Sequence, residues 1–481
     1  MIKKIMLALP NSRWFELRCW HTFPYTLGLL TSVLKDKYEV KILDADIEDL
    51  TLEETKKRIS DYSPDIFCIS CMSMEYAKSF KEMASIAKSA HPQTKVIIGG
   101  IYPTLLPEAL MKDENIDYAI IGEGEYRLPK LLDYLENKNF PIEQMDGLVY
   151  RKEEKIITQP VTNYIKNLDE LPFPCYDNVN LLSYANKANK YCYFLYPKRF
   201  PYAYTITSRG CAFNCIFCSS KSVNGPEIRY RSAENVLKEI DWLVKEHKIK
   251  DLIFLDDNFY LDKVRAKKIL QGLIERNYDL TWKSPNVAVY ALDDELLELM
   301  KASGCYHIAL AIESGTEEVL KLLRKPLKLS KAREVVKKAK SLGFEVTAMF
   351  VIGTPGETWE QIRQTFRFAE ELDLDYAAFN IATPLPKTEL YKIAKEKNLL
   401  PKDFRFDNLD FKGYGKASIT TDEFTPEELQ ILRAFEWDRI NFKNNEKAIK
   451  IAKMNGITME QLNKWRVSTR RNIGVNVKLT R

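Results

Sequence analysis

The sequence predicts an α/β protein made of an N-terminal doubly wound parallel sheet, a partial barrel of six strand–helix units and a mainly helical C-terminal region. Two observations predict this arrangement. Short apolar runs alternate with helical patterns over residues 1–135, and the same alternation returns over residues 200–395. A third observation, a loop of three closely spaced cysteines, opens the second series. Residues 136–199 are predicted to be a connector, and residues 396–481 the helical region.

In the first series we predict strands at residues 4–9, 39–43, 66–70, 95–98 and 118–121, and helices near 26–34, 53–59, 77–90 and 106–111. Doubly wound sheets bind ligands at the carboxyl ends of their strands. The residues predicted there are Ser70, Gly99, Gly100, Gly122, Glu123 and Gly124. Glycines at strand ends allow a large ligand to approach the backbone closely, although ordinary turns use glycine too.

In the connector, residues 147–157 suggest a small hairpin, and prolines at 172 and 174 cannot continue a helix. The second series predicts strands at 202–207, 251–255, 287–290, 307–312, 345–352 and 376–381. Six strands are too few to close an ordinary barrel of eight. His307 falls inside a strand pattern and is predicted to be a packed or hydrogen-bonded residue. Thr425 and Pro426 predict the start of a helix that runs to residue 442.

The loop after the first barrel strand holds Cys211, Cys215 and Cys218, spaced C-x3-C-x2-C. Three thiolates from one short loop can hold three irons of a cubane [4Fe–4S] cluster, which leaves the fourth iron open to an amino group and a carboxylate. The alternative is structural zinc, which usually takes four ligands from paired cysteine knuckles. No second pair occurs among the nine cysteines of the chain, so the spacing favours the cluster.

Composition narrows the functional class. Of 481 residues, 45% are hydrophobic and 29% charged, which is ordinary for a soluble globular protein. A net charge of +5 is too balanced to predict a nucleic-acid partner. No apolar run approaches the length of a membrane span. An odd number of cysteines with no secretion signal is typical of a reducing cytoplasm, which is the location we expect.

The cysteine loop, with the aromatic Phe217 directly before its third cysteine, resembles the radical S-adenosylmethionine (radical SAM) superfamily. The resemblance implies a TIM-type barrel and assigns further residues by their places after the strands. The methionine amino group would meet Asp256 and Asp257, the ribose would meet Glu313, and Ser314 beside it would also belong to the cofactor site. Adenine would meet the backbone of the segment that contains Gly353, Pro355 and Gly356. By themselves, these residues would also suit a helix cap and a tight turn. The family often has glycine where this chain has Lys387.

Residues 1–135 resemble the Rossmann-like cobalamin-binding domain that precedes many radical SAM enzymes. The motifs that carry this resemblance are Pro24-x3-Gly28, Asp44-Ala45-Asp46 and the glycine segments at 99–100 and 122–124. Several cobalamin domains ligate cobalt through a histidine of Asp-x-His-x2-Gly, but the Asp44 segment contains no histidine. The resemblance therefore implies bound cobalamin without a histidine ligand from this loop.

Together the two resemblances imply an enzyme that cleaves SAM reductively at a [4Fe–4S] cluster and forms a 5′-deoxyadenosyl radical. Cobalamin-dependent methylation of an unactivated carbon is the reaction implied first. A radical cyclase, oxidase or rearrangement enzyme, with or without cobalamin, is the alternative, followed by a non-catalytic iron–sulfur protein. The expected partners are a small-molecule or peptide substrate and an electron donor such as flavodoxin or ferredoxin. Fold-level analogy does not identify the substrate.

Overall fold

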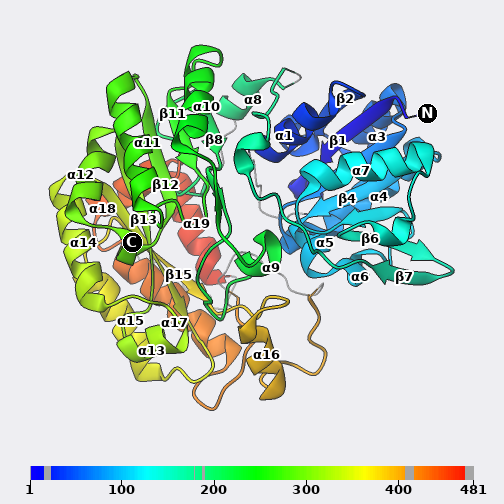
Figure 1. Cartoon of the computed structure of the whole chain (residues 1–481). Helices are drawn as coiled ribbons and strands as arrows, with labels where there is room; N and C mark the ends of the chain where they lie inside the picture. Colours follow the sequence, from blue (N-terminus) through cyan, green and yellow to red (C-terminus); the bar gives the residue numbers. More distant parts are fainter. Residues whose placement is uncertain (1, 16–22, 178, 187–189, 407–415, 472–481) are drawn as a thin grey trace. The chain divides into compact units, whose positions relative to one another are not determined.

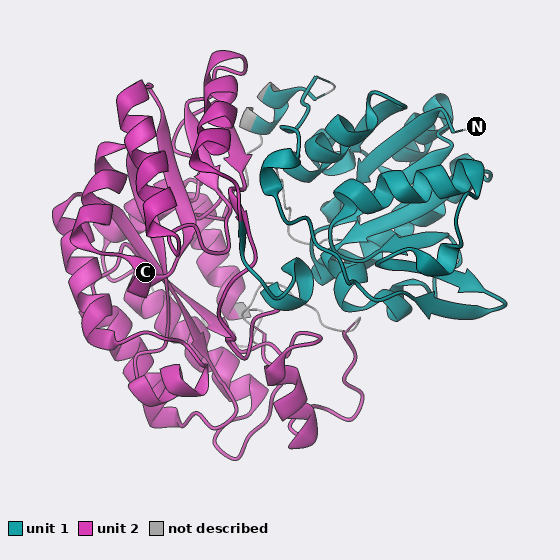
Figure 2. Cartoon of the chain, viewed as in Figure 1, with its two compact units in different colours: residues 1–187, 220–229 teal, residues 188–219, 230–481 magenta. Residues whose placement is uncertain are grey.

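The computed structural model describes residues 2–15, 23–177, 179–186, 190–406 and 416–471. The chain divides into two compact units (Figures 1 and 2). Unit 1 comprises residues 1–187 and 220–229, and unit 2 comprises residues 188–219 and 230–481. Each unit is built around its own sheet, in which the strands that alternate with helices are parallel, as the sequence pattern predicts.

Unit 1 contains a seven-stranded sheet in the order β2-β1-β3-β4-β5-β6-β7. The first five strands in this order are parallel, and the hairpin of β6 and β7 adds two antiparallel strands. The strands are β1 (Lys4–Leu9), β2 (Glu39–Asp44), β3 (Ile66–Cys71), β4 (Lys95–Gly100), β5 (Tyr118–Ile120), β6 (Leu148–Lys152) and β7 (Lys155–Thr158). The buried positions on one face of the sheet form an apolar core with the helices that cover that face. The predicted strands and the predicted hairpin of this unit are confirmed.

The helices of unit 1 pack in pairs, α1 with α7 and α3 with α4, which is the arrangement of a doubly wound sheet. They are α1 (Tyr25–Leu34), α2 (Ala45–Glu48), α3 (Leu52–Tyr62), α4 (Ala77–Ala90), α5 (Ile101–Leu105), α6 (Pro107–Leu110), α7 (Gly124–Asn137), α8 (Leu181–Asn186) and α9 (Ser220–Asn224). Local sequence fixes several helix starts. Thr51 and Glu54, for example, form a reciprocal capping box at α3.

Unit 2 contains six parallel strands whose spatial order follows the chain, β8-β11-β12-β13-β14-β15, so the predicted partial barrel is confirmed. The strands are β8 (Tyr202–Thr205), β11 (Asp251–Phe254), β12 (Thr281–Val287), β13 (Cys305–Glu313), β14 (Glu345–Ile352) and β15 (Tyr376–Ile381). The helices between them are α10 (Ala233–Lys245), α11 (Lys263–Arg276), α12 (Asp294–Ala302), α13 (Glu317–Leu322), α14 (Leu329–Ser341) and α15 (Trp359–Glu371).

The prediction for the third barrel strand is wrong. Residues 287–290 were expected to form it, but β12 lies earlier, and residues 289–291 form a 3-10 helix. Lys283 and Pro285 conceal the strand in the sequence, because a buried lysine and a strand proline are both unusual. The pairing of β12 with β13 shifts register around Pro285. Lys283 Nζ donates to the carbonyl oxygen of Tyr193 at 2.6 Å, so the buried ammonium group has a hydrogen-bond partner.

His307 is confirmed as a packed, hydrogen-bonded residue. Its Nε2 lies 3.0 Å from Thr347 Oγ1, and only 1% of the residue is exposed. Burial, with a smaller contribution from Lys283, lowers the pKa of His307 well below its ordinary value. The ring is therefore neutral near pH 7 and belongs to the barrel core.

The C-terminal region is helical where the structure describes it. The helices are α16 (Glu389–Glu396), α17 (Pro426–Asn441), α18 (Asn445–Met454) and α19 (Met459–Arg471). The predicted helix start at Thr425 is confirmed. Helix α17 covers the outer edge of β15, where Asn441 donates to Ala377 O at 2.9 Å and accepts from Ala377 N–H at 2.8 Å. This side chain satisfies both backbone groups of Ala377 on a strand that lies at the edge of the sheet among the described residues.

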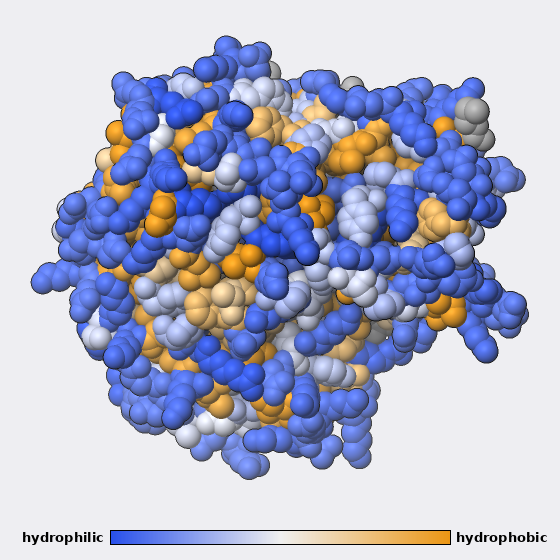
Figure 3. All heavy atoms as spheres, viewed as in Figure 1, coloured by the Kyte–Doolittle hydropathy of each residue, from blue (hydrophilic) through white to orange (hydrophobic). Residues whose placement is uncertain are grey.

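Hydrophilic side chains dominate the face drawn in Figure 3, and the apolar atoms on it form scattered patches. Among the described residues, none of the helices has the length and apolar character needed to cross a membrane.

Candidate active site

The predicted cluster loop has irregular backbone and follows β8 and the two-residue strand β9 (Ser208–Arg209). Cys211 and Cys215 are partly buried, and Cys218 is exposed. In the described part of the chain, no three His, Cys, Asp or Glu residues gather as ligands of one metal ion. The thiolates of a cubane cluster each bind a different iron and lie further apart than ligands of a single ion. Three thiols on this loop therefore fit three corners of a cluster.

Two apolar residues hold the loop against the end of the barrel. Ile216 donates its N–H to Leu323 O at 3.3 Å and accepts from Leu390 N–H at 2.8 Å, and its side chain packs on Leu323. Phe217 packs beside it, against apolar groups that include Val351 and Leu390. Phe217, predicted to be near the cofactors, thus has an apolar anchoring contact in the structure.

Glu313 stands at the carboxyl end of β13, where a bulge interrupts the pairing with β14 and its φ is +73°. A non-glycine residue in this conformation costs about 1–3 kcal/mol, and such residues cluster at functional sites. Lys325 Nζ donates to Glu313 Oε1 at 2.9 Å. Burial alone would lower the pKa of Lys325, but Glu313 and the thiols of Cys215 and Cys211 raise it. The protonated ammonium therefore provides a positive charge near both partly buried thiols.

Asp256 holds the base of the cysteine loop. Its carboxylate accepts from the N–H and hydroxyl of Thr207, at 3.1 and 2.7 Å, and from the hydroxyl of Ser208 at 2.5 Å. Burial raises the pKa of Asp256, and these donors oppose the rise. Asp257 is partly exposed, and Asp262 caps the following helix. The two aspartates predicted for the methionine amino group are thus differently placed, and Asp256 is committed to the scaffold.

Asn258 lies directly after the two aspartates and contacts the cysteine loop. Its Nδ2 is 3.6 Å from Cys211 Sγ and 3.4 Å from Tyr290 Oη. Its Oδ1 is buried and has no hydrogen-bond partner among the described residues. Leaving a buried acceptor unpaired costs about 1–3 kcal/mol. This oxygen is therefore a ready acceptor, next to a predicted cluster ligand, for an N–H group of a bound molecule.

The backbone of the segment after β14 is hydrogen-bonded to a buried carboxyl group. Glu357 Oε2 accepts from Gly353 N–H at 2.7 Å and from Thr354 N–H at 3.0 Å. Burial raises the pKa of Glu357 to about 7, against the effect of these two donors. Gly353 has φ +80°, and a Cβ there would lie 2.2 Å from Leu429 Cδ2. Glycine is therefore required at the start of the segment predicted to contact adenine.

The other residues predicted for the nucleoside lie around this segment. Pro355 is buried, whereas Gly356 is exposed. Ser314 is fully buried, its Oγ lies 3.2 Å from Thr365 Oγ1, and it accepts from Thr316 N–H at 3.2 Å. Ser314 thus fixes the turn after Glu313 from within the protein.

In unit 1, backbone lines part of the carboxyl edge of the sheet. Ser70 and Gly99 are paired residues of β3 and β4. A Cβ on Gly99 would meet only Ile120 O, at 3.9 Å, so the space above this glycine is open. Gly100 has φ +106°, and a Cβ there would lie 2.3 Å from Cys71 O. An edge without side chains at these two positions fits the close approach of a broad, flat ligand such as a corrin.

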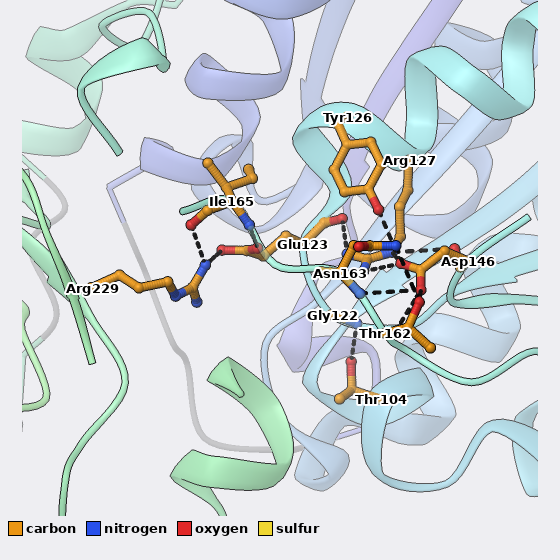
Figure 4. A network of polar contacts seen from close by, with 10 residues as sticks. All are labelled: Thr104, Gly122, Glu123, Tyr126, Arg127, Asp146, Thr162, Asn163, Ile165 and Arg229. Atoms are coloured by element: carbon orange, nitrogen blue, oxygen red, sulfur yellow. Dashed lines mark hydrogen bonds and ion pairs between the residues drawn. The ribbon is translucent and has the colours of Figure 1, made fainter. Parts of the chain in front are cut away.

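Figure 4 shows how Gly122 and Glu123 of the Gly122–Gly124 segment are held. Gly122 N–H donates to Thr104 Oγ1 at 2.9 Å, and Gly124 begins α7. Glu123 Oε1 lies 2.7 Å from Arg229 Nη1, with the two side chains 6% and 8% exposed. Glu123 Oε2 accepts from Ile165 N–H at 2.8 Å. The Glu123 carboxylate, predicted to be near cobalamin, is thus bound by protein groups.

The neighbouring ion pair in Figure 4 joins α7 to the connector. Arg127, fully buried, donates to Glu123 O at 2.9 Å and pairs with Asp146. Burial alone would raise the pKa of Asp146, but Thr162 and Arg127 lower it to about 2. A groove of about 630 Å³ runs beside this pair, and neither Ser70 nor Gly99 lines it. The hydrogen bonds from Arg127 to Glu123 O and from Gly122 N–H to Thr104 therefore fix the backbone of the Gly122–Gly124 segment.

Four residues of these sites were not predicted from the sequence: Asn258, Lys325, Glu357 and Arg229. Lys325 is separated from Glu313 by 12 positions, and Arg229 from Glu123 by 106, so no local pattern joins either pair. Asn258 and Glu357 did carry a signal, because each directly follows a predicted ligand segment at a strand end.

Comparison with known families finds two matches in this chain. Residues 205–369 match the family described as the Radical SAM superfamily. Residues 20–132 match the B12 binding domain. The first match spans the cysteine loop and the strand ends of β11, β13 and β14, and the second spans the Ser70–Gly99 edge.

Similar proteins cover most of the chain. An uncharacterized methyltransferase of Pyrococcus horikoshii is 35% identical over 402 residues, 83% of this chain and 84% of that protein. Cytidylyl-2-hydroxyethylphosphonate methyltransferase of Streptomyces wedmorensis is 29% identical over 440 residues, 81% of each chain. The structure of the radical S-adenosylmethionine methyltransferase TsrM from Kitasatospora setae, with cobalamin and a [4Fe–4S] cluster bound, shares the fold. Its TM-score is 0.70 at 17% identity, over 98% of this chain and 99% of that one.

Proposed function

Because this chain belongs to the radical SAM enzymes that carry a B12-binding domain, we propose that it methylates an unactivated carbon in a cobalamin-dependent reaction. Its cofactors are a [4Fe–4S] cluster, SAM and cobalamin. The observation that carries the proposal is the occurrence, in one chain, of the cysteine loop and of an open glycine edge at Ser70 and Gly99. Two relatives that match this chain over most of its length are named methyltransferases, and this supports methyl transfer.

When bound, the cluster supplies the electron that cleaves SAM, and cobalamin carries the methyl group. The protein's own groups bind and orient. Cys211, Cys215 and Cys218 hold three irons in this proposal. Asn258 Oδ1 accepts from the methionine amino group, and the Lys325 ammonium pairs with the methionine carboxylate. The carboxylate oxygens of Glu313 accept from the ribose hydroxyls.

The scaffold residues keep these groups in position. Asp256 fixes the start of the cysteine loop through Thr207 and Ser208. Glu357 fixes the adenine segment through the N–H groups of Gly353 and Thr354. Preorganised contacts of this kind lower the cost of orienting a large ligand.

We further propose a cytoplasmic location and an electron donor of the flavodoxin or ferredoxin type. A cluster with partly exposed thiols needs a reducing environment, and one-electron cleavage of SAM needs a reductant. The substrate is proposed to be a small molecule or a peptide, and no feature of the described residues narrows that class.

The function is tested on protein reconstituted anaerobically with iron, sulfide and cobalamin, then given SAM and a reductant. Methyl transfer by this route consumes SAM in two ways, so both 5′-deoxyadenosine and S-adenosylhomocysteine are expected. 5′-Deoxyadenosine without S-adenosylhomocysteine would contradict methylation and favour a radical cyclase, oxidase or rearrangement enzyme. Absence of both products would contradict the radical SAM assignment itself. The triple variant Cys211→Ala, Cys215→Ala, Cys218→Ala is the control and should form no 5′-deoxyadenosine.

A further inference from the structure

One hydrogen bond in unit 2 joins a barrel side chain to a cysteine of the predicted cluster loop. Asn258 Nδ2 lies 3.6 Å from Cys211 Sγ, a normal distance for an N–H donor and sulfur, and Asn258 is 3% exposed. Asn258 follows β11, whereas Cys211 follows β8, so the contact spans 47 positions and depends on the pairing of these two strands. The donor side chain is therefore fixed by the barrel.

The chemistry of the partners fixes the orientation of the amide. A thiolate can only accept a hydrogen bond, so the amide must present Nδ2 to Cys211. The second contact of Nδ2 is Tyr290 Oη at 3.4 Å. The Tyr290 ring is held in turn by Phe213, with ring centroids 4.8 Å apart. Tyr290 therefore acts as a clamp that keeps both hydrogens of the amide nitrogen engaged, one on sulfur and one on the phenol oxygen.

The polar contact of Cys215 is of a different kind. Its Sγ lies 4.0 Å from Arg324 O, and a carbonyl oxygen cannot donate to a thiolate. The charge of Lys325 acts on both cysteines and interacts more strongly with Cys215 than with Cys211. The Asn258 contact thus adds a directed N–H donor at Cys211, the cysteine on which the Lys325 charge acts less.

We propose that Asn258 is a positioning residue that raises the reduction potential of the cluster by donating a hydrogen bond to the Cys211 thiolate. This inference rests on the proposed function, because it requires the cluster. Reduction adds an electron to the cluster and increases the negative charge on its sulfur ligands. An N–H donor on sulfur stabilises the reduced form more than the oxidised form, and such bonds are among the factors that set cluster potentials.

The test is a redox titration of the anaerobically reconstituted holoenzyme without SAM, followed by electron paramagnetic resonance of the reduced cluster. Asn258→Leu removes the donor at similar volume. At the potential that half-reduces the wild-type cluster, the ratio of reduced to oxidised cluster in Asn258→Leu should be about tenfold lower than in the wild type. This corresponds to a reduction potential lower by about 59 mV for one electron. Tyr290→Phe keeps the donor and loosens its clamp, so its potential should fall less than that of Asn258→Leu.

Iron content and visible absorbance show that each variant carries an intact cluster. If Asn258→Leu does not assemble one, Asn258→Asp replaces it, since it keeps the shape, loses the donor and adds negative charge, and its potential should also fall. If the wild-type protein carries a cluster and the variants have an unchanged reduction potential, this inference is overturned and the proposed function is not. Wild-type protein that assembles no cluster overturns both the inference and the proposed function.

Discussion

Lys325 Nζ lies 2.9 Å from Glu313 Oε1, and each side chain is about nine-tenths buried. A buried ion pair is weak evidence for stability, because desolvation offsets much of the attraction between the charges. Its position is more informative. The pair stands at the end of a bulged strand, and the thiols of Cys211 and Cys215 are among the charges that act on Lys325. The pair therefore belongs with the cysteine loop in the proposed SAM site.

Replacing Glu313 should weaken SAM binding. Glu313→Ala removes the proposed acceptor of the ribose hydroxyls and leaves the Lys325 ammonium buried without its partner. Unpaired buried groups cost about 1–3 kcal/mol, so the dissociation constant for SAM should rise about ten- to a hundredfold. Equilibrium dialysis with the reconstituted protein measures it, and Glu317→Ala, on the exposed first turn of α13, is the matched control. An unchanged constant at full iron content would remove Glu313 from the site.

Glu357 should make the stability of the protein depend on pH. Its pKa is raised from an ordinary 4.5 to about 7 in the folded chain, so the folded form keeps a proton that the unfolded form releases. Stability therefore falls as pH rises from 4.5 to 7 and is constant above that. Glu357→Gln keeps an acceptor for Gly353 and Thr354 and removes this loss, which is at most about 3 kcal/mol.

The measurement is thermal unfolding of wild type and Glu357→Gln between pH 5 and pH 8. The unfolding midpoint of the variant minus that of the wild type should increase as pH rises to 7 and should stay constant above pH 7. A difference between the two midpoints that stays the same over the whole range would show that Glu357 does not hold its proton.

The three loop cysteines should be the only protein ligands of the cluster. Cys211→Ala, Cys215→Ala and Cys218→Ala together should reduce the iron content from about four per chain to none after reconstitution. Cys68, Cys71 and Cys305 serve as matched controls, because they are buried and burial raises the pKa of each thiol. Cys→Ser at each of these should leave the iron unchanged. About four irons in the triple variant would mean that other ligands hold the cluster.

Much of the fold could be predicted from local patterns. The strand at Glu345–Ile352 and the helix at Ala77–Ala90 were predicted to the residue, because apolar periodicity decides both. The third barrel strand was misplaced, because Lys283 and Pro285 are satisfied by a carbonyl contact and a register shift that only the folded chain provides. The places predicted for ligands at the strand ends stay predictions.

The partners of the site residues could not be predicted. Asp256 was predicted to meet a ligand, but its oxygens are taken by Thr207 and Ser208, 49 and 48 positions away. Glu123 was likewise assigned to the cobalamin site, and in the structure its carboxylate is bound by Arg229. Sequence spacing indicates which edge of a sheet a residue reaches. The hydrogen-bond donors that contact the residue at that edge depend on pairings between distant segments.

Cobalamin should bind without a histidine ligand to cobalt. Asp44, in the segment where several cobalamin domains place that histidine, caps α2 and accepts from Tyr184 Oη at 2.7 Å. Among the described residues of unit 1 the one histidine is His91, which ends α4 at the amino end of β4. Electron paramagnetic resonance of the Co(II) form should show cobalt hyperfine lines without splitting by an axial nitrogen. Such splitting would contradict this prediction.

The most direct test of methyl transfer follows the methyl group itself. Reconstituted protein carrying cobalamin is incubated anaerobically with a reductant and SAM labelled with deuterium in its methyl group, and the cobalamin is analysed by mass spectrometry. We predict labelled methylcobalamin and an equal amount of S-adenosylhomocysteine, with no substrate required. Protein that retains cobalamin and cleaves SAM to 5′-deoxyadenosine, yet leaves the cobalamin unlabelled, would contradict the account.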